Sequence, residues 1–296
     1  MTCYHPLLVY KSEGKVVFEK PFAFARGFNL PCGQCIGCRL NYSRQWAIRL
    51  VHEAQMHDKS CFITLTFNDE SLFARENPFS LDISEYQRFM KRLRKKYGSH
   101  IRFFHCGEYG DLNKRPHYHA ILFGVDFAED RKLWSQKDGM KLFTSESLEK
   151  LWPYGFCTIG QVTFESCAYV ARYIMKKQTG EKAEEHYMRW DPQTGEGTAI
   201  SPEYCTMSRK PGIGKSWIEK YKTDVYPHDY VVINEHKVKP PRFYDQQLDD
   251  EQLRKVKEQR IKDADDPIKD YGPEMDRLWV SQEIKIKKLE RLIRNL

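Results

Sequence analysis

The chain has 296 residues, of which 41% are hydrophobic and 30% are charged, values that fit a globular protein with one substantial core. It contains no apolar run of the length that a membrane-spanning helix requires, and its first residues lack the pattern of a secretory signal, so we expect a cytoplasmic protein. The net charge of +7 suits a polyanionic partner, although solubility alone would also explain it.

The beginning of the chain predicts short strands, a cysteine cluster and a helix. Residues 1–30 mix apolar runs with turn residues and predict one or two short strands. Residues 39–50 have apolar and aromatic residues near helical spacing, with arginines on the outer side, and predict a helix.

The cysteine cluster lies between these elements. Cys32, Cys35 and Cys38 follow one another at intervals of three, and in a cytoplasmic chain such spacing favours metal binding over disulfides. A closed tetrahedral zinc site needs a fourth ligand, for which Cys3 is the first candidate and His5 a substitute. An iron–sulfur cluster has the same spacing, but no second cluster motif supports it. Three free buried thiols are the remaining alternative. We expect the other five cysteines to be core residues.

A strand and a basic amphipathic helix come next. Residues 61–67 are dense in β-forming residues and end at a turn. Apolar residues recur at helical spacing from about Ser84, and Gly98 is a stop signal for this helix. The opposite helix face is cationic and, with the loop that follows, either tracks a DNA backbone or is only a solvated face. The candidate DNA-binding residues are Arg88, Lys91, Arg92, Lys95, Lys114 and Arg115.

Two further strands carry the main candidate site. Residues 101–106 and 118–124 are joined by a polar loop and predict an antiparallel pair. His117 and His119 are two residues apart at the start of the second strand, so both can point to one face and chelate a divalent ion. Glu108, near the end of the partner strand, can approach them as a third ligand. Two imidazoles and a carboxylate with open positions suit Mg²⁺ or Mn²⁺ acting as a Lewis acid. The alternative is two histidines on a solvated strand face.

A helix with two tyrosines follows. Residues 145–152 predict a helix, residues 156–163 a strand, and a third helix begins near Ser166. On this third helix Tyr169, Tyr173 and Lys176 fall on one narrow face, opposite an apolar stripe. A phenol is a weak nucleophile because its pKa is about 10, but a metal-polarised phosphate and a nearby ammonium ease its attack. The alternative is an exposed tyrosine pair without a chemical role.

The rest of the chain shows no further catalytic motif. Residues 179–214 are rich in turn-forming residues and predict a long loop. The segment at 212–216 superficially matches a phosphate-binding loop, but Arg209 stands where that pattern requires Gly, so nucleotide hydrolysis is rejected. Residues 245–296 are mostly charged with periodic apolar residues and predict one or two exposed helices or a partly ordered tail.

Three segments in this order resemble the motifs of rolling-circle replication initiators with a His-hydrophobe-His metal site. They are residues 62–67, His117-Tyr118-His119 and Tyr173-Ile174-Met175-Lys176. The resemblance is closer to the initiators of gokushovirus-type microviruses, which are small single-stranded DNA phages. It also includes the cysteine cluster, residues 107–110, the paired tyrosines and residues 208–214, and it weakens beyond Pro241.

The resemblance implies an α+β fold with a central antiparallel sheet flanked by helices, the fold of His-hydrophobe-His endonucleases. We expect a cysteine-rich zinc knuckle at 1–50, the nicking endonuclease domain at 51–240 and a charged helical tail at 241–296. The implied catalytic ion is Mg²⁺ or Mn²⁺ on His117 and His119, with Glu108 completing the set and His105 and Asp111 left open as third ligands. Zn²⁺ is the expected structural ion.

The resemblance also implies the reaction. Tyr173, with Lys176 three positions later, is the first-choice nucleophile, and Tyr169 is the second. The family's product is a 5′-phosphotyrosine link and a free 3′-hydroxyl that primes rolling-circle synthesis at a phage origin, before the strands are rejoined. No helicase motif is visible, so a host helicase and a host DNA polymerase are the expected partners, in the cytoplasm of the bacterial host and away from membranes.

Two other classes of protein remain alternatives. One is a zinc-dependent protein that binds single-stranded DNA without cutting it, in which the histidine pair is structural. The other is a conjugative relaxase or a transposase with the same chemistry, which would more often have a longer chain or another motif order.

Overall fold

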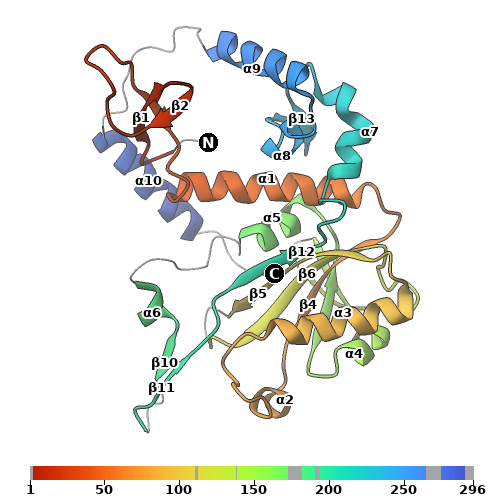
Figure 1. Ribbon diagram of the computed structural model, residues 1–296. Coiled ribbons are helices and arrows are strands. Elements are labelled where there is room, and N and C mark those ends of the chain that lie inside the picture. Colours follow the sequence, from red (N-terminus) through yellow and green to blue (C-terminus); the bar gives the residue numbers. More distant parts are fainter. Residues whose placement is uncertain are drawn as a thin grey trace. The chain divides into compact units, whose positions relative to one another are not determined.

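A computed structural model describes residues 3–110, 113–137, 139–172, 182–190, 194–264 and 275–290 (Figure 1). The chain divides into two compact units. The cysteine unit comprises residues 1–44 and 254–296, and the sheet unit comprises residues 45–253. Among the described residues, no helix has the length and apolar character needed to span a membrane.

A seven-stranded antiparallel sheet forms the centre of the sheet unit. Its strand order is β12-β5-β6-β4-β9-β8-β7, and each neighbouring pair is antiparallel. The strands are β4 (Ser60–Leu65), β5 (Arg102–Tyr109), β6 (Pro116–Phe123), β7 (Lys132–Lys137), β8 (Met140–Thr144), β9 (Cys157–Gly160) and β12 (Tyr204–Met207). The predicted antiparallel pair is therefore confirmed as β5 and β6, and the α+β class with it.

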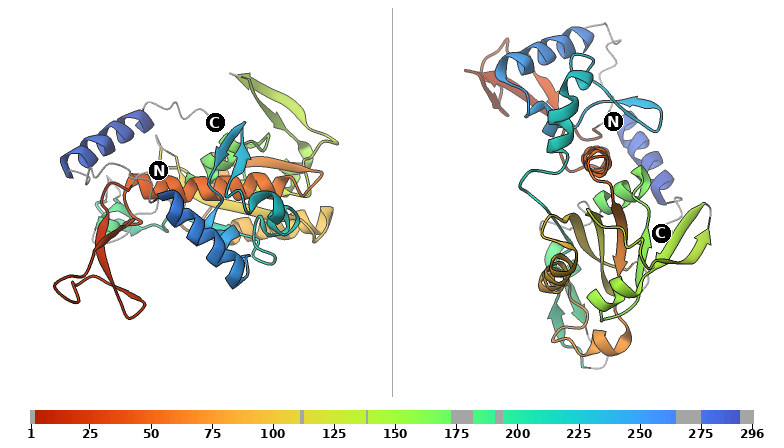
Figure 2. Two further views of the ribbon diagram at one scale, coloured as in Figure 1. Left: turned by 90° about the horizontal axis from the view of Figure 1, so that it is seen from above. Right: turned by 90° about the vertical axis from the view of Figure 1, so that its right-hand side faces the viewer.

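Helices cover both faces of this sheet. On one face lie α3 (Ile83–Tyr97) and α4 (Glu146–Leu151), whose apolar residues share a core with Tyr118 of β6. On the other face lie the second half of α1 (Ile36–Ala54) and α5 (Phe164–Arg172), around Phe62 and Ile121. Figure 2 shows α3 and α5 on opposite sides of the sheet. The predicted helices at 84–97, 145–152 and 166 onward are all confirmed within two residues at their starts.

The long loop predicted over 179–214 is wrong for part of that range. The segment contains α6 (Lys182–His186), β10 (Met188–Trp190), β11 (Gly197–Ala199) and β12. β10 and β11 pair with each other, whereas β12 pairs with β5 and forms an edge of the main sheet. Strands this short carry too little alternation to be recognised from their own residues, because pairing with distant strands stabilises them.

A second layer packs on the outer side of α1. It consists of α7 (Lys215–Val225), β13 (Val231–Ile233), β14 (His236–Val238) and α8 (Arg242–Asp245). Glu53 of α1 ties this layer to the sheet, because its carboxylate accepts hydrogen bonds from Arg102 Nε at 2.6 Å and from Gly214 N at 2.7 Å. Residues 208–214 are thus held by buried contacts, and the phosphate-loop interpretation has no support from them.

The cysteine unit contains a three-stranded sheet of order β2-β1-β3. Its strands are β1 (Leu7–Ser12), β2 (Lys15–Val17) and β3 (Phe28–Leu30), one more than the sequence predicted. The helices predicted after residue 245 are observed as α9 (Asp250–Ala264) and α10 (Met275–Glu290). The domain boundaries at residues 50 and 240 remain a prediction.

Candidate functional site

Glu108, His117 and His119 form a group that can hold one metal ion. Glu108 and His117 are directly paired across β5 and β6, and His119 is paired with Cys106. The His117 Nε2 and His119 Nε2 atoms lie 2.7 Å and 2.8 Å from the same oxygen, Glu108 Oε1. All three ligand atoms lie within 4.8 Å of one another. Strand alternation and register therefore gather one carboxylate and two imidazoles on the α5 side of the sheet.

Each histidine is oriented through its other ring nitrogen. His119 Nδ1 is 2.9 Å from the Thr64 hydroxyl, and His117 Nδ1 is 3.1 Å from the Arg115 carbonyl oxygen. A hydrogen bond from Nδ1–H to these oxygens leaves Nε2 unprotonated and available as a ligand. Thr64 was not identified from the sequence, because only the pairing of β4 with β6 places it opposite His119.

Burial and charge both favour an anionic ligand at Glu108. The Glu108 side chain is 2% exposed, whereas His117 is 17% exposed and forms the solvent side of the group. Burial alone would raise the pKa of Glu108, but hydrogen bonds from His117 and His119 outweigh it and lower the pKa to about 2. The carboxylate is therefore charged throughout the neutral range, as a ligand for a hard cation must be.

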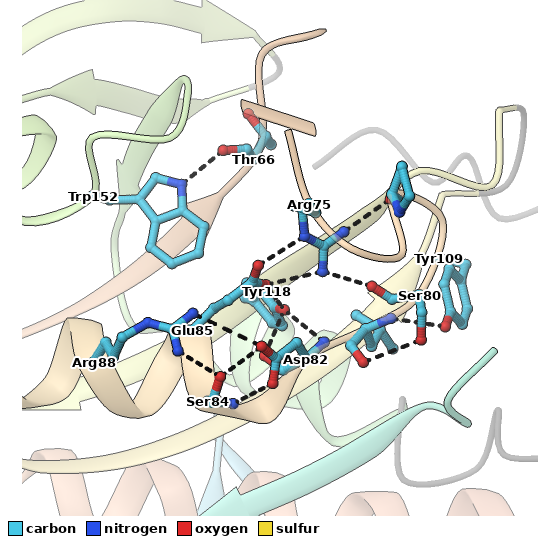
Figure 3. A network of polar contacts seen from close by, with 12 residues as sticks. Thr66, Arg75, Ser80, Asp82, Ser84, Glu85, Arg88, Tyr109, Tyr118 and Trp152 are labelled. Atoms are coloured by element: carbon cyan, nitrogen blue, oxygen red, sulfur yellow. Dashed lines mark hydrogen bonds and ion pairs between the residues drawn. The ribbon is translucent and has the colours of Figure 1, made fainter. Parts of the chain in front are cut away.

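The residue between the two histidines points to the opposite face of the sheet. The Tyr118 hydroxyl donates to the Glu85 carboxylate and accepts from the Asp82 backbone N–H at 3.2 Å. Glu85 in turn receives Arg75 Nε at 2.7 Å (Figure 3). This buried network connects the metal-ligating strand to the start of α3.

Tyr169 of α5 lies beside the metal-ligating group. The centroid of its ring is 5.2 Å from that of His119, in an edge-to-face arrangement, and 6.3 Å from that of Phe62. The Arg172 guanidinium is 5.9 Å from the same ring. The apolar stripe predicted on this helix is confirmed for Cys167, which is buried against the sheet. Tyr173 and Lys176 lie outside the described residues.

The alternative third ligands are not part of this group. His105 is fully buried on the α3 face, where its ring stacks on Tyr86 with centroids 3.4 Å apart and its Nδ1 lies 3.0 Å from the Thr206 hydroxyl. Its distance of three residues from Glu108 along one strand explains the opposite orientation. Asp111 lies outside the described residues.

A second group that can hold a metal ion is formed by Cys3, Cys32, Cys35 and Cys38 of the cysteine unit. Cys3 Sγ lies 3.8 Å from Cys35 Sγ, which matches the edge of a tetrahedron with Zn–S bonds of about 2.3 Å. Backbone N–H groups of Tyr4, Cys32 and Cys35 donate to cysteine sulfurs at 3.3 Å, as expected for thiolates. His5 is not a member of the group.

The other cysteines mostly fill the core. Cys61, Cys106, Cys157 and Cys167 are buried, and Cys205 is partly buried. Burial raises the pKa of Cys61 and Cys167 well above the ordinary range of a thiol. These thiols are therefore protonated and unreactive at neutral pH.

The predicted DNA-binding cations are spread over the side of the sheet away from the histidines and over the loop before β6. Arg88 and Arg92 of α3 bond within the protein, to Ser84 Oγ at 2.7 Å and to the Leu151 carbonyl at 2.9 Å. Lys91, Lys95 and Lys114 are exposed. Arg115 pairs with Asp69 at 2.6 Å. DNA contact by these six residues remains a prediction.

Comparison with known proteins gives consistent similarities. A family model for replication-associated proteins of the ORF2 type matches residues 60–178. The chain is 34% identical over 256 residues to replication-associated protein VP4 of Bdellovibrio phage phiMH2K, covering 82% of this chain and 76% of that protein. It is 32% identical over 295 residues to replication-associated protein ORF2 of Spiroplasma virus 4, covering 89% and 87%. No solved structure matches the chain significantly.

Proposed function

The chain belongs to the family of phage replication-associated proteins, and from this premise we propose that it is a replication initiator that nicks single-stranded DNA at a phage origin. The observation that carries the proposal is that Glu108, His117 and His119 converge on one point with Tyr169 beside them. A zinc-dependent module that binds DNA without cutting it would not need a tyrosine at this place.

Each residue of the site has a proposed role. Glu108, His117 and His119 hold Mg²⁺ or Mn²⁺, which polarises the phosphate oxygens of the bound strand. Thr64 and the Arg115 carbonyl keep the imidazoles oriented. The exposed edge of His117 leaves room for the DNA to approach. The family fold of a His-hydrophobe-His endonuclease is proposed on the same basis.

The proposed reaction is a transesterification. The phenol oxygen of a tyrosine attacks phosphorus, the bond from phosphorus to the 3′ oxygen breaks, and that oxygen takes up a proton as the phenol loses one. The products are a 5′-phosphotyrosine and a 3′-hydroxyl that primes synthesis. One phosphodiester replaces another, so the reverse attack rejoins the strands. Tyr173, with Lys176 near it in sequence, and Tyr169 are the candidate nucleophiles.

The decisive experiment uses labelled single-stranded oligonucleotides that together cover the source genome. The purified protein is incubated with them in Mn²⁺ and resolved by denaturing electrophoresis. We expect label at the mass of the protein only when the divalent ion is present. Single Tyr169→Phe and Tyr173→Phe variants identify the attacking residue, and the double variant removes the adduct.

Tyr221→Phe is the matched control, because Tyr221 lies on α7 in the second layer. It should form the adduct as the unsubstituted protein does. An adduct that survives the double substitution contradicts the tyrosine mechanism. DNA binding without any adduct, over all oligonucleotides and metals, favours the zinc-dependent binding module instead.

The cellular setting follows from the phage relatives. We propose that the protein acts in the cytoplasm of the bacterial host, with a host helicase unwinding the strand and a host polymerase extending the 3′-hydroxyl. Zn²⁺ is the proposed occupant of the four-cysteine group, because four thiolates in a tetrahedral set suit that ion.

A further inference from the structure

An exposed aromatic pair lies on the same face of the sheet as the metal-ligating group. Trp134 of β7 and Phe156, the residue before β9, have ring centroids 4.9 Å apart. Their exposed fractions are 55% and 43%. Single exposed aromatics are common, but two rings in contact that are both about half exposed form an apolar surface that the described residues of the sheet unit leave open.

The register of the strands places Phe156 in one row with the metal ligands. Glu108 pairs with His117, and the β4–β6 register that pairs Thr64 with His119 brings Thr66 opposite His117. Thr66 N and Thr66 Oγ1 both bond the Phe156 carbonyl oxygen, at 3.1 Å and 2.8 Å. Phe156 therefore lies two strands from His117, a separation of about 10 Å.

The side chains in this row point to the same side. Thr64 contacts His119, so Thr64 and Thr66 face the metal group. Cys157 belongs to the core on the α3 side, and its neighbours Phe156 and Thr158 therefore face the other way. Figure 2 agrees, since the β7–β8 hairpin extends from the sheet on the side away from α3 in both views.

The surroundings of the pair suit a nucleic-acid strand. Lys137, Met140 and Lys141 of the same hairpin are exposed. Lys137 is paired with Met140, two residues before Leu142, and Leu142 lies beside Gly160 on the metal side. A cation next to two exposed rings is the combination that holds single strands, with the charge on the backbone and the rings against the bases.

We propose that Trp134 and Phe156 form a stacking platform for bases that flank the cleaved phosphodiester. This inference rests on the proposed function, because it takes the metal-ligating group as the position of the scissile phosphate. The separation of about 10 Å allows a base only a few nucleotides from the cut to reach Phe156. The platform sets how the strand crosses the sheet, whereas the metal ligands and tyrosines act on the phosphate.

The test measures binding of the nicked oligonucleotide by fluorescence anisotropy, without divalent ions so that no cleavage occurs. The probes are the intact strand and a series with one abasic position on either side of the cut. We expect Trp134→Ala and Phe156→Ala each to weaken binding of the intact strand about 5- to 100-fold. Trp134→Phe should restore most of the affinity. The loss should vanish for the strand that lacks the stacked base, as a double-mutant cycle requires.

Trp190→Ala is the matched control, because Trp190 is 66% exposed on the β10–β11 hairpin outside the main sheet. Equal binding by Trp134→Ala and the unsubstituted protein, with the Mn²⁺-dependent adduct still formed, overturns the platform and leaves the nuclease intact. A loss that persists at every abasic position also overturns it, because the rings would then act on something other than bases. Absence of both binding and adduct in the unsubstituted protein overturns the proposed function and the platform together.

Discussion

Thr64 is the residue whose importance at the metal site is most sharply testable. Its hydroxyl is 2.9 Å from His119 Nδ1 and fixes which ring nitrogen faces Glu108. We predict that Thr64→Val reduces Mn²⁺ affinity about 10- to 100-fold, the range for loss of such an outer partner. Isothermal titration with Mn²⁺ measures it. Thr158→Val is the control, since Thr158 pairs with Thr64 across β4 and β9 but is not part of the ligand group. Unchanged affinity in Thr64→Val would refute this role.

Tyr118 acts through the opposite side of the same strand. Its hydroxyl is shared between Glu85 and the Asp82 backbone, all beneath the sheet. We predict that Tyr118→Phe lowers the free energy of unfolding by about 1–3 kcal/mol, because Glu85 and Asp82 N–H lose a buried partner. Urea denaturation measures the change. Tyr97→Phe should cost less, because the Tyr97 hydroxyl bonds Glu129 in an exposed setting. A larger loss in Tyr97→Phe than in Tyr118→Phe would contradict this reasoning.

At the scale of elements, α1 joins the sheet to the second layer through a buried histidine. The His52 ring stacks on Trp217 with centroids 3.5 Å apart, and its Nδ1 lies 2.8 Å from the Tyr244 hydroxyl. Burial lowers the pKa of His52 from 6.5 to about 3. The folded protein therefore keeps this imidazole neutral over a range in which the unfolded chain protonates it.

This shift predicts how stability depends on pH. The stabilising contribution is complete above pH 6.5 and is lost progressively as pH falls toward 3, by about 1.4 kcal/mol per pH unit. His52→Gln should be less stable at pH 7 but should lose less stability between pH 6.5 and 4.5. Urea denaturation at several pH values measures both slopes. The exposed His228 gives the control variant His228→Gln. Parallel slopes for His52→Gln and the unsubstituted protein would exclude the linkage.

At the scale of the whole molecule, two units with separate cores carry separate metal-ligating groups. The four cysteines belong to the cysteine unit, and Glu108, His117 and His119 belong to the sheet unit. We predict that the purified protein carries one tightly held Zn²⁺, and that Cys38→Ser loses it and destabilises the cysteine unit. Elemental analysis and thermal unfolding measure these effects. Cys205→Ser, a substitution in the sheet unit, should retain the Zn²⁺. A protein purified without Zn²⁺ that folds normally would contradict this assignment.

The sequence by itself determined the local elements and most of the site. The spacing of His117 and His119 predicted a shared face, Gly98 predicted the end of α3, and the tyrosine spacing predicted a helix face opposite an apolar stripe. These inferences succeed because the backbone geometry of a strand or helix sets the direction of neighbouring side chains. The homologues then agree with the resemblance that these residues carried.

Only the tertiary structure decided which distant residues meet. The register of β5 and β6 selects Glu108 over His105, the pairing of β4 brings Thr64 to His119, and β12 joins the sheet from a segment that reads as a loop. The row from Glu108 through His117 and Thr66 to Phe156 spans residues far apart in the chain. Such proximity depends on strand order and register, which are set by burial of the whole sheet rather than by any local pattern.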